Sequence, residues 1–176
     1  MPNDSLPSLA LSVRQPWAWA IIHGDKDIEN RTAGSIRAGG MDCQRICIHA
    51  ASGMRQSEHR WAVHKLAKVG VRAPAPDALV RSAIIGTVDV IDIVAESDSP
   101  WFDGPCGLVL DNPEAIVPIP AKGALGYFAW ERAGAVAPTL PWMTGWGRAG
   151  GDDATLALFD DLPTGFKTPP AKPFKR

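Results

Sequence analysis

The feature that most constrains the fold of this chain is a long apolar run over residues 83–94, in which Val and Ile predominate. β-Branched residues of this kind are typical of a strand. Its two acidic residues, Asp89 and Asp92, are three positions apart, which breaks the alternation of a regular strand. A bulge or bend between them would explain the break, as expected where a strand wraps around a small barrel.

The rest of the pattern predicts a mixed α+β domain. Residues 17–22 and 54–69 are predicted as helices; the first ends at Gly24, a natural position for a left-handed residue, and the second at Gly70. The proline-flanked segment 113–120 is expected at a sheet edge. Further short strands are expected at residues 9–13, 28–32, 45–50, 107–110, 115–119 and 125–130. Two or three helices with about six short strands, in no regular alternation, favour a barrel-like α+β fold over a doubly wound sheet.

The chain of 176 residues is long enough for one domain with a hydrophobic core and a tail. The domain is expected over residues 9–132, after an N-terminal extension at residues 1–8 and before a Pro/Gly-rich C-terminal tail at residues 133–176. Most of this tail is interpreted as extended or poorly ordered. No apolar run reaches the roughly eighteen residues of a membrane span, and no signal-peptide pattern is recognised. A cytoplasmic protein without a membrane partner is therefore expected.

The tail contains one apolar segment, residues 155–159, followed by two aspartates. We expect this segment to dock on the protein's own domain. It also resembles the Leu-x-Leu-Phe peptides by which bacterial proteins bind the replication sliding clamp, with Thr155 in place of the usual Gln. The tail is therefore a candidate site for a protein partner.

The run at residues 45–50 alternates between apolar and other side chains. Its isoleucines are expected to face the core, whereas Cys47 and His49 are expected to face outward with Arg45. Cys47 and His49 could act as metal ligands together with Cys43, but no second ligand pair is evident. Three cysteines, an odd number, argue against a disulfide framework. The sequence therefore predicts neither a metal nor a cofactor.

Charge is distributed unevenly along a chain whose formal net charge is only -1. Residues 14–72 contain ten Lys or Arg and five Asp or Glu, and residues 73–132 contain three and nine. This asymmetry predicts a positive and a negative region, unless the two interleave in the fold. On the helix predicted over residues 54–69, Arg60 and Lys68 belong to a stripe of basic residues. Such a stripe can follow a phosphate backbone, or it can be a solvated helix face.

Three ionisable residues follow closely after Gly24, in a Gly-x-Lys-x-x-Glu-x-Arg motif at residues 24–31. If residues 28–32 form a strand, Glu29 and Arg31 share one face of it. Lys26, in the turn before the strand, can reach the same face. Such a cluster suits an anion or a nucleotide. The alternative is a surface ion pair, which contributes about 0–1 kcal/mol.

The segment Leu-Ser-Val-Arg-Gln-Pro-Trp-Ala at residues 11–18, followed by this motif, resembles the activating-signal-cointegrator homology (ASCH) domain. The resemblance covers about residues 9–131 and departs at residues 32–42, which are rich in Gly and lack the aromatic residue expected after Arg31. Further similar segments follow in the same order at residues 46–51, 85–88, 99–105 and 122–128.

The resemblance implies a β-barrel similar to that of PUA domains, with a cleft along the motif strand that binds single-stranded RNA or a modified nucleotide. Single-stranded DNA is a further candidate partner. In such a cleft Arg31 can contact a phosphate bidentately, and Trp101 can stack on an unpaired base. Trp17 can stack likewise or belong to the core. The predicted nucleic-acid-binding residues are Arg14, Trp17, Lys26, Glu29, Arg31, Arg60, Lys68, Trp101 and Lys122.

The alternative prediction is a small enzyme that acts on RNA or nucleosides, with Lys26 and Glu29 as catalytic residues. Some relatives resemble acetylcytidine amidohydrolases, in which a Lys at the position of Lys26 acts as base and a Thr three residues later as nucleophile. Glu29 occupies that later position and cannot form an alkoxide. In a ribonuclease, Lys26 or Arg31 would stabilise the phosphorane while Glu29 or a histidine, His23 or His49, transfers protons. Binding is favoured over catalysis, because a Lys paired with Glu is expected to stay protonated.

Overall fold

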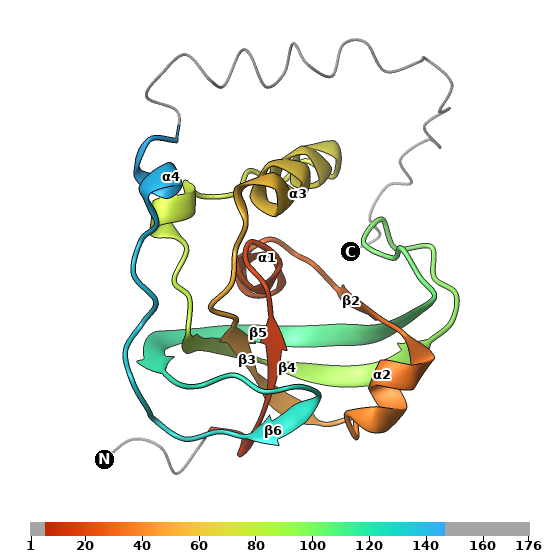
Figure 1. The fold of residues 1–176 in the computed structure, drawn as a ribbon. Coiled ribbons are helices and arrows are strands. Elements are labelled where there is room, and N and C mark those ends of the chain that lie inside the picture. The colour runs from red at the N-terminus through yellow and green to blue at the C-terminus, as the bar shows by residue number, and fades with distance from the viewer. Residues whose placement is uncertain (1–5, 147–176) are drawn as a thin grey trace, which may run out of the picture. The chain divides into compact units, whose positions relative to one another are not determined.

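The computed structural model describes residues 6–146. Their strands form one six-stranded sheet that curls into a half-barrel, in the order β2-β5-β4-β3-β1-β6 (Figure 1). Strands β1 and β3 are parallel, and the other neighbouring pairs are antiparallel. The strands are β1 (Leu9–Val13), β2 (Ile28–Arg31), β3 (Arg45–Ala50), β4 (Ala83–Val94), β5 (Cys106–Pro120) and β6 (Tyr127–Ala129). The predicted α+β fold with a barrel-like sheet is confirmed.

Helix α1 lies between the sheet and helix α3 (Figure 1). Ile21 and Ile22 of α1 belong to the main core, and Ala20 packs with Leu66 of α3. The sequence did not predict α2, which starts after Thr32, whose side chain accepts a hydrogen bond from the Ser35 N–H at 3.1 Å. The helices are α1 (Trp17–His23), α2 (Ala33–Ala38), α3 (Gln56–Lys68) and α4 (Pro141–Thr144), with a 3₁₀ turn η1 (Pro76–Ala78).

The long strand predicted at residues 83–94 is confirmed as β4, and its irregularities explain the curl of the sheet. Its register against β5 shifts at three places, and one of them, between Val90 and Asp92, lies between the two aspartates, where the bulge or bend was predicted. Such shifts bend a strand and increase its twist. Residues 107–110 and 115–119, predicted as two strands, belong to one strand, β5. Beyond Leu110, β4 is the only strand that pairs with β5 among the described residues, so the proline-flanked half of β5 is an edge, as predicted.

Contacts between distant segments draw the two ends of the curled sheet together. The Arg31 guanidinium at the end of β2 donates a hydrogen bond to the Ser12 carbonyl of β1 at 3.0 Å. The Tyr127 N–H of β6 donates to the Gly39 carbonyl just after α2 at 2.8 Å. A Cβ at Gly126 would lie 2.3 Å from the Gly39 Cα, so this approach requires glycine. Strands at opposite ends of the sheet order therefore lie close together in space.

Strand β3 is buried on both faces, so the prediction that Cys47 and His49 face outward is wrong. Both are at most 1% exposed. They lie on the face of the sheet that Ala121, after β5, and Phe128 of β6 cover. Burial raises the pKa of the Cys47 thiol to about 11, which disfavours the thiolate that a metal requires. No group of three potential metal ligands occurs among residues 6–146.

Residues 133–144, the start of the predicted tail, pack against the domain. The buried Arg81 guanidinium donates to the carbonyls of Ser52 and Pro138. Met143 of α4 is buried with Met54 and Leu79. Residues 147–176, including the segment 155–159, lie outside the described residues. No helix within the described range is both long and apolar enough to cross a bilayer.

The buried His59 of α3 generates a prediction about acid stability. Its side chain lies against Trp142, and burial lowers its pKa from 6.5 to about 4. Between these values the unfolded chain binds a proton that the folded chain does not, so stability falls as the pH is lowered from 6.5 and the loss is complete below about 4. We expect this residue to contribute a loss of up to roughly 3 kcal/mol.

Urea unfolding of the native chain and of His59→Leu at pH 7.5 and pH 4.5 measures this loss. The variant should lose less stability on acidification than the native chain. His23→Leu, at an exposed position on α1, is the matched control and should behave as the native chain. An unchanged pH dependence in His59→Leu would contradict the prediction.

Candidate functional site

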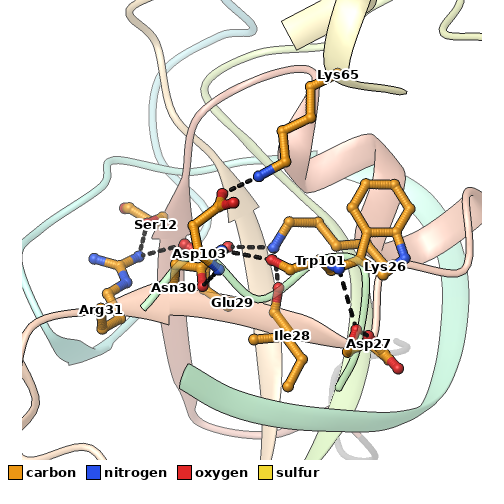
Figure 2. A network of polar contacts seen from close by, with 11 residues as sticks. Ser12, Lys26, Asp27, Ile28, Glu29, Asn30, Arg31, Lys65, Trp101 and Asp103 are labelled. Atoms are coloured by element: carbon orange, nitrogen blue, oxygen red, sulfur yellow. Dashed lines mark hydrogen bonds and ion pairs between the residues drawn. The ribbon is translucent and has the colours of Figure 1, made fainter. Parts of the chain in front are cut away.

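The three ionisable residues of the motif lie together, with Glu29 in the middle. Its Oε2 accepts a hydrogen bond from the Lys26 ammonium at 2.9 Å, and its Oε1 is 3.3 Å from the Arg31 guanidinium. The Lys26 side chain is only 4% exposed and that of Glu29 only 12%. Figure 2 shows Lys26 on one side of Glu29 and Arg31, with Ser12, on the other. The cluster is therefore a buried charge network and not a surface ion pair.

The turn after α1 directs Lys26 inward. The N–H groups of Gly24 and Lys26 both donate to the Ala20 carbonyl, at 2.8 and 3.1 Å. The left-handed residue of this turn is Asp25, with φ of 55°, and not Gly24 as predicted. Gly24 is favoured for another reason: a Cβ there would lie in a tight contact, 3.1 Å from the Ala20 Cα. The Lys26 ammonium then also donates to the Ile28 carbonyl, so two of its three protons are engaged.

Lys26 and Glu29 lie in the wall of a cavity of about 210 Å³ that aromatic side chains surround. Asn30 of β2 and residues on α1, on α3 and in the loop between β4 and β5 contribute the rest of the lining. The cavity is lined by Trp17, Lys26, Glu29, Asn30, Trp61, Lys65, Trp101 and Asp103. Because a water molecule takes up about 30 Å³, the space corresponds to about seven waters, which suits one flat ring system rather than a length of polymer.

Helix α3 supplies the outer rim of this cavity. Trp61 meets Trp17 edge to face with ring centroids 5.6 Å apart, and Trp61 is 57% exposed. The Lys65 ammonium lies 5.9 and 5.7 Å from the centroids of these two rings and pairs with the Asp103 carboxylate (Figure 2). Burial, and then the nearby Lys26 charge, lower the pKa of Lys65. The rim is therefore accessible to solvent, whereas Lys26 and Glu29 are buried.

Asn30 of β2 holds the loop that carries Trp101. Its Nδ2 donates to the Trp101 carbonyl at 2.8 Å, and its Oδ1 accepts from the Asp103 N–H at 2.8 Å (Figure 2). Trp101 is only 5% exposed, so it forms a wall of the cavity and is not a solvent-exposed loop residue. The same strand thus positions both the charged and the aromatic components of the site.

The predicted binding residues fall into separate places. Trp17, Lys26, Glu29 and Trp101 line the cavity, whereas Arg31 lies behind Glu29. The remaining four are exposed: Arg14 forms an ion pair with Glu58 of α3, Arg60 and Lys68 lie on α3, and Lys122 lines a separate groove.

The list of predicted residues did not include four that line the cavity: Asn30, Trp61, Lys65 and Asp103. One signal could have found two of them. Trp61 and Lys65 are four positions apart on a predicted helix and therefore share a face. Asn30 and Asp103 become neighbours only through the packing of a loop against β2, which no local pattern indicates.

Comparison of the chain with models of known protein families and with curated proteins finds no match. Membership of the ASCH family therefore stays a prediction based on the ordered sequence segments given above.

The position of Glu29 between two cations generates a second prediction. Glu29→Gln keeps the size of the side chain but removes the only carboxylate that contacts Lys26 within residues 6–146. Because a buried charge then loses its partner, we expect a loss of about 3–5 kcal/mol in the free energy of unfolding. Urea denaturation measures this loss.

Glu58→Gln is the matched control, since it breaks the exposed Arg14–Glu58 pair, in which the side chains are 54% and 40% exposed. An exposed pair of this kind contributes at most about 1 kcal/mol. Equal losses in the two variants would show that burial adds nothing to the Glu29 network.

Proposed function

We propose that this protein binds single-stranded RNA or a modified nucleotide, and that one base enters the cavity beside Lys26. The observation that supports this most is the convergence of three tryptophans on a cavity whose buried wall contains an ammonium–carboxylate pair. A nucleobase has flat faces for stacking and an edge with both donors and acceptors. The tryptophans of the cavity offer faces for stacking, and the Lys26–Glu29 pair offers a donor and an acceptor for the edge of the base.

Stacking would supply most of the binding energy. A base stacked on an aromatic side chain contributes about 1–3 kcal/mol and does so for every base. Hydrogen bonds at the edge of the base would then discriminate one base from another. Lys26 has one proton that neither Ile28 nor Glu29 engages, and each Glu29 oxygen has a second lone pair. An acceptor and a donor that are adjacent on a base edge match this pair.

The exposed cations of α3 are suited to contact the phosphate backbone of a bound RNA. The side chains of Arg60 and Lys68 form no ion pair or hydrogen bond within the described part of the chain. They are therefore available for phosphates outside the cavity. Such contacts would add affinity that falls with salt and carries no sequence information.

An enzyme acting on RNA or nucleosides is the second candidate, and one observation favours it. Lys65 lines the cavity with a lowered pKa, which makes it a better proton acceptor than an ordinary lysine. Lys65 is also paired, with Asp103, but this pair lies at the accessible rim, whereas the predicted catalytic pair, Lys26 and Glu29, is buried and engaged with opposite charges. Incubation with labelled RNA and with acetylcytidine, beside a Lys26→Ala control, distinguishes turnover from binding.

Removal of the rim of the cavity should weaken nucleotide binding without unfolding the protein. Trp61→Ala removes an exposed ring, so we expect nucleoside monophosphates and short RNA to bind about tenfold more weakly, in line with the loss of one stacking face. Quenching of intrinsic tryptophan fluorescence, with fluorescence anisotropy of labelled oligonucleotides, measures this change. RNA and DNA of the same sequence are compared in parallel.

Arg60→Ala, at the adjacent position on α3, is the matched control. It should leave the affinity for mononucleotides unchanged and weaken RNA binding only slightly. The slope of log affinity against log salt concentration for RNA should become shallower by about one. Equal binding by Trp61→Ala and the native chain would contradict the proposal, as would the absence of binding to any of these ligands.

A further inference from the structure

Ser12 and His49 face a second concave region, separate from the tryptophan-lined cavity. It is an open groove of about 650 Å³ on the face of the sheet opposite the main core. The pairing of β1 with β3 places Ser12 directly beside His49. Other polar groups in the groove include Ser52, Ser82 and Lys122.

Hydrogen bonds define the proton positions on this pair. The His49 Nε2 lies 3.0 Å from the Ala121 carbonyl oxygen, and its Nδ1 lies 3.0 Å from the Ser12 Oγ. A carbonyl can only accept, so Nε2 carries the proton. In the neutral ring, Nδ1 must then accept the proton of the Ser12 hydroxyl. This is the arrangement of a serine with an adjacent base that a third group orients.

Burial supports the neutral form of the ring. His49 is 1% exposed, and burial lowers its pKa. A neutral imidazole at neutral pH is able to take a proton from the hydroxyl. Ser12 itself is half-buried and lines the groove.

The backbone after Ala121 passes close to the pair. A Cβ at Gly123 would lie 2.6 Å from the Ser12 Oγ and 2.9 Å from the His49 Nδ1, so only glycine fits there. The N–H groups of Gly123 and Ala124 form no hydrogen bond with any described residue. Free backbone donors in the lining of the groove are suited to a developing oxyanion.

We propose that Ser12 and His49 form a nucleophile–base pair that hydrolyses carboxylic esters bound in this groove. The Ser12 Oγ attacks the ester carbonyl carbon while His49 Nδ1 takes its proton. The bond to the alcohol then breaks, and His49 returns the proton to the leaving alcohol. Water attacks the acyl-serine, gives a proton through His49 to Ser12 and releases the carboxylic acid. The exposed Lys122 in the groove favours esters with a negative group.

This inference is independent of the proposed nucleotide binding and has its own test. The full chain is treated with a fluorophosphonate, which labels activated serines, and the labelled peptide is identified by mass spectrometry. We expect label on Ser12. With p-nitrophenyl acetate we expect a burst of up to one equivalent of p-nitrophenol followed by slow turnover, because an acyl-enzyme accumulates.

Ser12→Ala should lose the label and the burst, and His49→Gln should slow the burst about a hundredfold or more. Ser57→Ala, at an exposed hydroxyl on α3 outside the groove, should behave as the native chain. If Ser12→Ala fails to fold, peptide mapping of the native chain decides the question alone. Label on another residue, no label at all, or a burst that survives in folded Ser12→Ala would overturn the proposal.

Discussion

The structure depends on the carboxylate of Glu29, which lies between two cations in a place that water scarcely reaches. Without it, the buried Lys26 ammonium would lack a carboxylate partner and would lie near a second cation, the Arg31 guanidinium. Both cations would then have to move toward solvent. The same carboxylate fixes Arg31, whose guanidinium then reaches the Ser12 carbonyl. Because β2 and β1 are not neighbours in the sheet, this contact joins two strands that only the curl of the sheet brings together.

This network also connects the two concave regions of the molecule while keeping them chemically distinct. The tryptophan-lined cavity contains cations that are each paired with a carboxylate, so its electrostatic attraction for a distant polyanion is small. Recognition there would come from stacking and from hydrogen bonds at short range. The groove beyond Ser12 has a cation, Lys122, that pairs with no carboxylate in residues 6–146. Long-range attraction of anions therefore comes from Lys122 in the groove and from the exposed Arg60 and Lys68 of α3, and not from the paired cations inside the cavity.

Much of the fold could be predicted from local patterns, because β1, β3 and β4 have clear β-branched or alternating runs. The grouping of Lys26, Glu29 and Arg31 also followed from spacing alone. The burial of Cys47 and His49 could not be predicted from local patterns. It arises from Ala121 and Phe128, which lie more than seventy residues further along the chain. The spacing on α3 shows that Lys65 shares a face with Trp61, but that this face packs over α1 and the cavity is a tertiary property that a single helix pattern does not contain.

Three tryptophans around a small cavity could also suggest a cationic ligand, since aromatic faces attract cations. The positions of the two lysines argue against this. Lys65 already occupies the place beside Trp17 and Trp61 that a cation would take, and its pKa is lowered partly because Lys26 is close. A second cation would add to this repulsion, whereas a neutral ring with acceptor atoms, or an anion, would relieve it. The aromatic residues therefore favour an acceptor-rich flat ligand, and among common biological ligands a nucleobase is of this kind.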